Sequence, residues 1–149
     1  MDTHEIYMRK ALEEARRAEE EGEIPVGAVI ACKGRVIARA HNQTERLNDV
    51  TAHAEMLAIT SAAAALGGKY LNDCVMYVTL EPCAMCGGAL AWAQLGELVI
   101  GASDPRRGYG RLSPGVLHPK TKVTAGVLAE ECGDLVKRFF ARKRQTPPA

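Results

Sequence analysis

Four residues in two short stretches have the side chains and spacing of a metal-dependent hydrolytic site. The stretch TAHAEM contains His53 and Glu55, and the stretch TLEPCAMCGGA contains Cys83 and Cys86. Imidazole and thiolate groups are ligands that zinc prefers, and three protein ligands leave the fourth position of a tetrahedral zinc ion open to water. A separate carboxylate beside that position can move the water's protons. These residue types therefore indicate hydrolytic zinc chemistry.

The Cys83-x-x-Cys86 pair alone has other interpretations: a redox pair, half of a structural zinc site, or two small core residues. A thioredoxin-type pair normally accompanies a βαβ pattern, and a structural zinc site typically needs a second ligand pair. The remaining cysteines stand singly in apolar stretches and are expected to be buried, as free cysteines usually are; they are Cys32, Cys74 and Cys132. His53 and Glu55 are two positions apart on an expected helix, so one metal would not bind both. We expect His53 to be the ligand and Glu55 the proton carrier.

Hydrophobic patterning predicts one α/β domain, residues 1–149, with a sheet covered by helices. The chain is 47% hydrophobic and 25% charged, as in an ordinary globular protein. We expect helices at 3–21, 51–66, 83–93 and 127–144, strands at 26–32, 35–42, 74–80, 97–102 and 122–126, and a frayed tail at 146–149. Thr51 is the expected cap of the second helix, and Gly133 an expected break in the last. The loop 103–120 is long for a compact domain, which favours a functional role.

Charge and cysteine content favour a cytoplasmic protein without a membrane-spanning segment. The first twenty residues are charged throughout, unlike a signal peptide, and no apolar run approaches the ~20 residues of a membrane span. Five cysteines without an export signal favour a reducing compartment. The net charge is −3 over residues 1–74 and +4 over 75–149, with the basic stretches RRGYGR and KRFFARKR in the second half. These stretches could form one basic patch or be ordinary solvated charge.

Taken together, His53-x-Glu55 and Pro82-Cys83-x-x-Cys86 form the H-x-E…P-C-x-x-C pattern of zinc-dependent deaminases. The chain resembles the cytidine deaminase superfamily, and within it the bacterial tRNA-specific adenosine deaminases, which convert wobble adenosine to inosine. The resemblance extends from about Tyr7 to Arg144 through EIPVGAVI, HN, TAHAE, YVTLEPCAMCGGA and FFARKR. Val50 departs from it, because the family usually has proline there; we expect this to alter loop stiffness more than chemistry.

The resemblance implies a three-layer cytidine-deaminase-like fold with a central mixed five-stranded sheet flanked by helices. It implies one zinc per subunit on His53, Cys83 and Cys86, catalysis by Glu55, no organic cofactor, a homodimer, and a tRNA anticodon loop as partner. It further suggests substrate binding by four residues: Asn42, Ala54, Glu81 and Pro82. Basic and aromatic side chains suited to single-stranded RNA are expected at Arg106, Arg107, Tyr109, Arg111, His118, Phe140, Arg142, Lys143 and Arg144.

Several of these roles have ordinary structural alternatives. Asn42 could simply cap a strand end, and Glu81 could face solvent. His41, His118 and Trp92 are as consistent with structural roles as with substrate contact, and one of Phe139 and Phe140 is expected in the core.

Two rival functions stay open at this point. The first is deamination of a free base or nucleoside, guanine or cytosine in type, which would not need a basic C-terminal helix. The second is a non-catalytic zinc module that binds RNA or protein, which would not need Glu55 beside an open coordination position.

Overall fold

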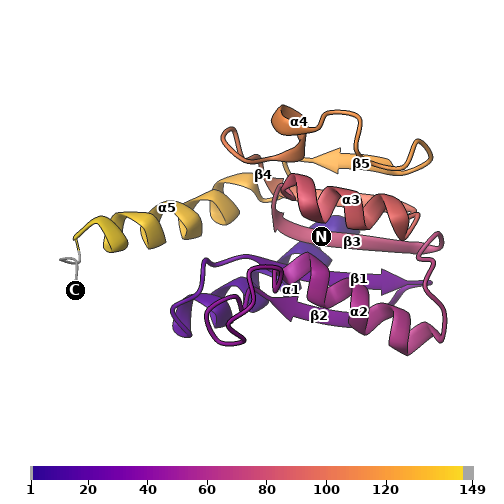
Figure 1. Cartoon of the computed structure of the whole chain (residues 1–149), viewed down its shortest axis with the longest axis horizontal. Helices are drawn as coiled ribbons and strands as arrows, with labels where there is room; N and C mark the ends of the chain where they lie inside the picture. Colours follow the sequence, from indigo (N-terminus) through magenta and orange to yellow (C-terminus); the bar gives the residue numbers. More distant parts are fainter. Residues whose placement is uncertain (1, 146–149) are drawn as a thin grey trace.

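The fold is a five-stranded sheet between two layers of helices, seen in a computed structural model that describes residues 2–145 (Figure 1). The helices are α1 (Thr3–Glu20), α2 (Ala54–Leu66), α3 (Ala84–Trp92), α4 (Tyr109–Leu112) and α5 (Ala129–Gln145). The strands are β1 (Gly27–Cys32), β2 (Arg35–His41), β3 (Cys74–Leu80), β4 (Glu97–Ala102) and β5 (Lys122–Ala125). No helix in this part of the chain is both long and apolar enough to cross a membrane.

The sheet is mixed, with strand order β2-β1-β3-β4-β5. β1 runs antiparallel to both of its neighbours, whereas β3, β4 and β5 are mutually parallel. β2, β3 and β4 consequently point the same way, and their carboxyl ends meet at one edge of the sheet. The segments that follow these three strands carry His53, Cys83 and the loop after residue 102, so the topology brings them together.

Each face of the sheet has its own hydrophobic core. On one face α2 and α3 pack against side chains such as Ile30, Met76 and Leu98. On the other face α1 and α5 pack against Val29, Tyr77 and Val99. These alternate positions of β1, β3 and β4 point to opposite sides, as strand geometry requires. The first half of α5 lies against the sheet, and its second half continues beyond the end of the sheet (Figure 1), where Arg142 pairs with Glu19 of α1.

The tight packing of α1 depends on Gly27 at the start of β1. A Cβ atom at this position would lie 2.0 Å from the carbonyl oxygen of Ala11 and 2.5 Å from the backbone nitrogen of Ala15. Both neighbours are backbone atoms that cannot swing aside. A glycine is therefore what allows α1 to approach the strand that closely.

The structure confirms the α/β class and the five strands, and corrects several local predictions. Thr51 does not cap α2, because its side chain and N–H both bind Asp49 Oδ1 at 2.8 Å and the helix begins three residues later. α5 is continuous through Gly133. The loop 103–120 contains the short helix α4, which was not predicted. Of the three cysteines expected in the core, Cys74 and Cys132 are buried, and Cys32 is partly exposed. The predicted tail 146–149 lies outside the described residues.

Candidate metal and active site

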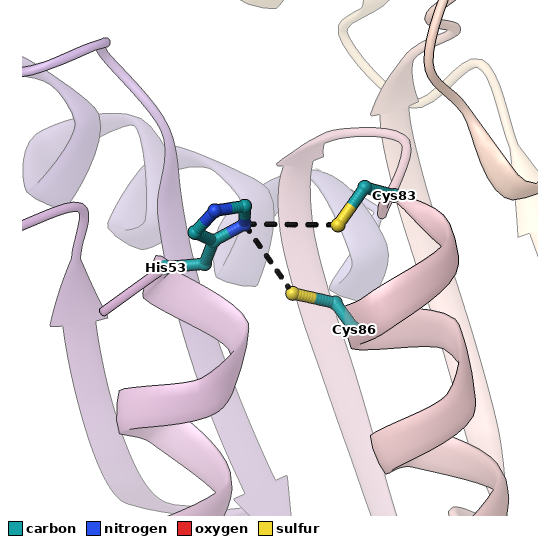
Figure 2. A group of neighbouring side chains, drawn as sticks. All are labelled: His53, Cys83 and Cys86. Atoms are coloured by element: carbon teal, nitrogen blue, oxygen red, sulfur yellow. Dashed lines mark hydrogen bonds between the residues drawn. The ribbon is translucent and has the colours of Figure 1, made fainter. Parts of the chain in front are cut away.

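His53, Cys83 and Cys86 converge between the first turns of α2 and α3 (Figure 2). The Nδ1 atom of His53 lies 3.7 Å from Cys83 Sγ and 3.5 Å from Cys86 Sγ. All three ligand atoms lie within 4.8 Å of one another, and no other group of three or more His, Cys, Asp or Glu side chains in residues 2–145 has this arrangement. The structure thus brings together the three residues predicted as zinc ligands.

The spacing of these atoms fits a zinc ion. With Zn–S bonds of about 2.3 Å and a Zn–N bond of about 2.0 Å, nitrogen and sulfur in a tetrahedron lie about 3.5 Å apart. Both of the N–S distances in the structure are close to that value. One imidazole and two thiols are also a donor set that zinc prefers. The group can therefore hold zinc through three protein ligands.

The thiols are already polarised towards metal binding. A hydrogen bond with Cys86, together with the nearby His53, lowers the pKa of Cys83 to about 4 despite the opposing effect of burial. Because the proton is then held on the neighbouring sulfur, the pKa of Cys86 is raised. The interaction with Cys83 also raises the pKa of His53. A bound cation would displace protons from these groups, because metal ligands must be deprotonated.

Both helices present their ligands at their N-terminal ends. His53 is the N-cap residue of α2 and Cys83 the N-cap residue of α3, and neither side chain caps its own helix. Their side chains consequently stay available for metal. In α2, the capping hydrogen bond comes instead from Asn42, whose Oδ1 accepts the N–H of Ala54 at 2.7 Å. The end of β2 thereby fixes the start of α2 beside the metal group.

Glu55 lies in the first turn of α2, and its side chain is only 4% exposed. Burial raises its pKa to about 7. A carboxyl group with this pKa can both accept and release a proton near neutral pH, which is the property that general acid–base catalysis needs. It lines the same cavity as His53 and Cys83.

This cavity has a volume of about 900 Å³ and opens at the sheet edge where β2, β3 and β4 end. His53 and Cys83 of the metal group line it together with Glu55, whereas the buried Cys86 does not, and the segment after β4 and α5 contribute further lining residues. The residues from the predicted site that line it are Asn42, His53, Glu55, Glu81, Cys83, Arg106, Arg107, Phe140 and Arg144. The cavity therefore joins part of the metal group to a rim of basic side chains.

Two predicted substrate-binding residues do not line the cavity. Ala54 is fully buried in the core, and Pro82 is also buried. The carbonyl oxygen of Pro82 accepts the N–H of Tyr109 at 2.9 Å. Glu81 does line the cavity, but both of its carboxylate oxygens accept backbone N–H groups from the loop that follows β4.

The predicted RNA contacts divide into two groups. Arg106, Arg107, Phe140 and Arg144 line the cavity, whereas five others do not: Tyr109, Arg111, His118, Arg142 and Lys143. Tyr109 packs partly against the core, and burial raises its pKa. His118 Nδ1 accepts the N–H of Lys120, Arg142 donates to Glu19 at 2.8 Å, and the ammonium of Lys143 lies over the Phe139 ring.

The residues whose roles were left open also have defined places. His41 is buried, with Nδ1 3.2 Å from Glu14 and Nε2 3.0 Å from Glu21. Trp92 is 85% exposed. Phe139 is in the core, as expected for one of the two phenylalanines.

Sequence reasoning missed three polar residues that line the cavity, Ser103, Asp104 and Lys137. Asp104 had a local signal, since Asp-Pro is a common turn initiator. Lys137 lies in the basic stretch KRFFARKR, but only the helix register shows that it faces the same cavity as Arg144. Ser103 carried no signal of its own.

Comparison with known proteins places these features in context. A family model described as the cytidine and deoxycytidylate deaminase zinc-binding region matches residues 1–102. The tRNA-specific adenosine deaminase of Bacillus subtilis (strain 168) is 43% identical over 154 aligned residues, covering 100% of this chain and 96% of that protein. The tRNA-specific adenosine deaminase of Aquifex aeolicus (strain VF5) is 43% identical, covering 94% of this chain and 95% of that protein.

Solved structures agree with this relationship. A structure from a study of A-to-I editing by tRNA:A34 deaminases at the wobble position of transfer RNA superimposes with a TM-score of 0.81 at 43% identity, covering 87% of this chain and 97% of that one. A guanine deaminase from Nitrosomonas europaea has a TM-score of 0.82 at 26% identity, covering 95% of this chain and 86% of that one.

Proposed function

The chain belongs to the cytidine and deoxycytidylate deaminase family, and on that premise we propose that it hydrolyses adenosine to inosine at the wobble position of a tRNA anticodon. The proposal rests on one observation: a His-Cys-Cys metal group and a buried carboxylate lie at the same cavity as a rim of basic side chains. Relatives at 43% identity over nearly the whole chain are tRNA-specific adenosine deaminases. The guanine deaminase is a more distant relative at 26% identity.

One zinc ion per chain, held by His53, Cys83 and Cys86, would supply an acidified water molecule as the nucleophile. Glu55 carries the protons. It accepts one proton from the attacking water and delivers it to N1 of adenine while the new C6–O bond forms. It then takes the remaining proton from the new C6 hydroxyl group and transfers it to the exocyclic amino group, so that the C6–N bond breaks and C6 becomes the carbonyl of inosine. Adenosine and water become inosine and ammonia.

Asn42 is suited to orient the base because it lines the cavity while its Oδ1 is fixed by the N–H of Ala54. Its remaining amide N–H groups are the donors that we assign to the flipped base or its sugar. Asn42 can thus cap the start of α2 and contact the substrate at the same time, because the cap uses the amide oxygen and the substrate contact uses the amide nitrogen.

An anticodon loop suits this cavity because it is single-stranded, so its base can be splayed out without breaking a duplex. Arg106, Arg107, Lys137 and Arg144 provide positive charge at the rim, and Phe140, 41% exposed, provides an aromatic surface. Single-stranded nucleic acids are commonly bound by this combination of phosphate contacts and stacking. A free base would need none of these rim charges.

We further propose that the chain works as a homodimer whose interface includes α3. This helix has the sequence AMCGGALAW without a charged residue, and Trp92 and Met85 are exposed on it. An uncharged helix ending in an exposed tryptophan is typical of an interface core.

A tRNA substrate and two metal-binding thiols also favour a reducing, cytoplasmic setting.

The decisive experiment compares substrates. Purified zinc-loaded protein is incubated separately with bulk tRNA, adenosine, guanine and cytidine, and inosine in tRNA and released ammonia are measured. We expect inosine in tRNA, with little ammonia from the three small substrates. Ammonia from guanine or cytidine without inosine in tRNA would replace this proposal by a free-base or nucleoside deaminase.

A further inference from the structure

The segment after β4 that carries Arg106, Arg107 and Arg111, residues 103–111, is here named the arginine loop. Its attachment to the rest of the molecule centres on Glu81, the residue between β3 and Pro82. Glu81 Oε1 accepts the N–H of Asp104 at 3.0 Å, and Oε2 accepts the N–H of Gly110 at 2.9 Å. One carboxylate thus binds both ends of the loop.

A second carboxylate continues this arrangement inside the loop. Asp104 Oδ1 accepts the N–H groups of Arg106 and Arg107, each at 3.1 Å. Glu81 therefore fixes the backbone of Asp104, and Asp104 fixes the turn that presents the two arginines at the cavity rim. Hydrogen bonds to charged acceptors are roughly twice as strong as neutral ones. These two carboxylates therefore add strong contacts to a turn that is also closed by the backbone bond from the N–H of Gly108 to the carbonyl of Asp104 at 3.0 Å.

Two glycines in the loop make room for the Glu81 carboxylate. A Cβ atom on Gly108 would lie 2.4 Å from Glu81 Cδ, and one on Gly110 would lie 2.9 Å from Oε2. The Gly110 position has no other close neighbour than this carboxylate. Gly110 therefore leaves open the space that the Glu81 carboxylate occupies.

The backbone around Glu81 is equally fixed. Its own N–H donates to the carbonyl of Ala102 at 2.8 Å, and the loop pairs with the metal-ligand turn through a bridge between Cys83 and Gly108. The loop is thereby held against the segment that carries a metal ligand. Glu81 itself brings a negative charge to a rim that we assign to phosphate binding, which argues against a direct contact with RNA.

We propose that Glu81 is a positioning residue for RNA recognition, holding the arginine loop so that Arg106 and Arg107 face the tRNA backbone. This inference rests on the proposed function. It assigns to Glu81 an indirect role in place of the direct substrate contact expected from the sequence.

Glu81→Gln tests the inference with almost no change in size. The amide offers one oxygen acceptor, and its NH₂ group cannot accept the second backbone N–H. The measurements are made in a Glu55→Ala background so that bound tRNA is not turned over. They are zinc content, tRNA affinity at two salt concentrations, and hydrogen exchange of the Asp104 and Gly110 amides. Glu20→Gln, an exposed carboxylate at the end of α1, is the matched control.

We expect Glu81→Gln to retain zinc, to exchange the Asp104 or Gly110 amide about 10-fold faster, and to bind tRNA about 10-fold more weakly. The log–log salt slope should fall by about 0.7 for each phosphate of the single strand that the protein no longer binds. Glu20→Gln should match the parent. Native affinity and slope in Glu81→Gln would overturn the inference, as would a loss of zinc, which would place the effect at Cys83. If the parent itself shows no salt-dependent tRNA binding, the proposed function fails as well.

Gly110→Ala provides an independent test through a double-mutant cycle. The added methyl group meets only the Glu81 carboxylate, so it should weaken tRNA binding when Glu81 is present and have little effect in Glu81→Ala. Coupling of this kind is expected between groups in contact. Equal effects of Gly110→Ala in both backgrounds would show that Glu81 does not set the loop position.

Discussion

At the scale of single residues, the three proposed metal ligands have unequal surroundings. Cys86 is fully buried, whereas His53 and Cys83 are partly exposed towards the cavity. The hydrogen bond with Cys86, together with the nearby His53, lowers the pKa of the Cys83 thiol to about 4. Replacement of Cys83 therefore tests the metal group at a partly exposed thiol, with less disturbance of the core than replacement of the buried Cys86.

The first prediction is that Cys83→Ala loses its zinc. Two remaining protein ligands cannot form the three-ligand site that catalytic zinc normally occupies. Zinc per chain is measured by elemental analysis after dialysis. Cys32→Ala, a change of the same kind at the far end of β1, should keep the native zinc content. Full occupancy in Cys83→Ala would show that this thiol is not a ligand.

The second prediction separates proton transfer from ligation. Glu55→Gln should keep zinc and bind tRNA with near-native affinity, while turnover falls by at least about 10²–10⁴-fold, the usual contribution of general acid–base catalysis. The amide keeps the shape of the buried side chain but cannot carry a proton between water and base. Single-turnover formation of inosine, with zinc content measured in parallel, checks this. Loss of zinc together with activity would instead identify Glu55 as a ligand.

At the scale of elements, the sequence predicted the type and order of nearly all helices and strands. Each of these elements buries one side regularly, so its apolar residues recur with the period of a helix or a strand. The starts of helices were less predictable. Thr51 has the right chemistry for an N-cap, but Asp49 binds it locally, and Asn42, directly after β2, supplies the cap at Ala54. Such a cap depends on tertiary contact and leaves no local signal.

Gly133 and α4 show two other limits of sequence patterns. Glycine in a helix interior costs up to about 1 kcal/mol relative to alanine, yet α5 continues through Gly133 because Cys132 and Leu135 on either side are buried against the sheet. The start of the short helix α4 is bound by the Glu81 carboxylate and the Pro82 carbonyl, both of which lie outside it. The metal group was predictable because its chemistry requires specific residue types; the cavity rim was not, because many basic residues could have formed it.

The third prediction concerns the two sides of α5. Lys137 and Arg144 line the cavity, whereas Arg138 does not. Replacing Lys137 and Arg144 together by alanine should weaken tRNA binding and reduce the log–log salt slope by about 0.7 for each phosphate that is no longer bound. Turnover at saturating tRNA should change much less than kcat/KM, because the interaction removed is mainly uniform binding.

Arg138→Ala is the control for that experiment, since it removes an exposed positive charge from the same helix. We expect it to leave the tRNA affinity close to native. An equal decrease in affinity in both variants would mean that general charge on α5 attracts RNA without a defined contact at the cavity. Unchanged binding in the Lys137/Arg144 variant would remove α5 from the RNA site.

At the scale of the whole molecule, a single chain borders the cavity with its arginine loop and with α5. The proposed substrate, an anticodon stem-loop, is broader than the site of a single base, so its recognition would require surface beyond this rim. The exposed, uncharged side of α3 adjoins the metal group, because Cys86 lies on the same helix as Met85 and Trp92. A second copy bound at α3 would extend the surface next to the cavity.

The last prediction is that Trp92→Glu converts a dimer into a monomer. An unpaired charge in a buried interface costs several kcal/mol, and about 1.4 kcal/mol corresponds to a tenfold change in affinity, so self-association should weaken by roughly 100-fold or more. Sedimentation velocity over a range of concentrations measures this directly.

Ile6→Glu is the control. It places the same charge at an exposed apolar position of α1, on the opposite face of the sheet, and should leave the dimer intact. Zinc content should be native in both variants, since neither residue touches the metal group. If the partner subunit completes the RNA site, tRNA affinity should fall in Trp92→Glu alone and recover at protein concentrations that restore the dimer. A Trp92→Glu protein that stays dimeric would place the interface elsewhere, and a monomeric variant with native tRNA affinity would show that one chain binds the anticodon unaided.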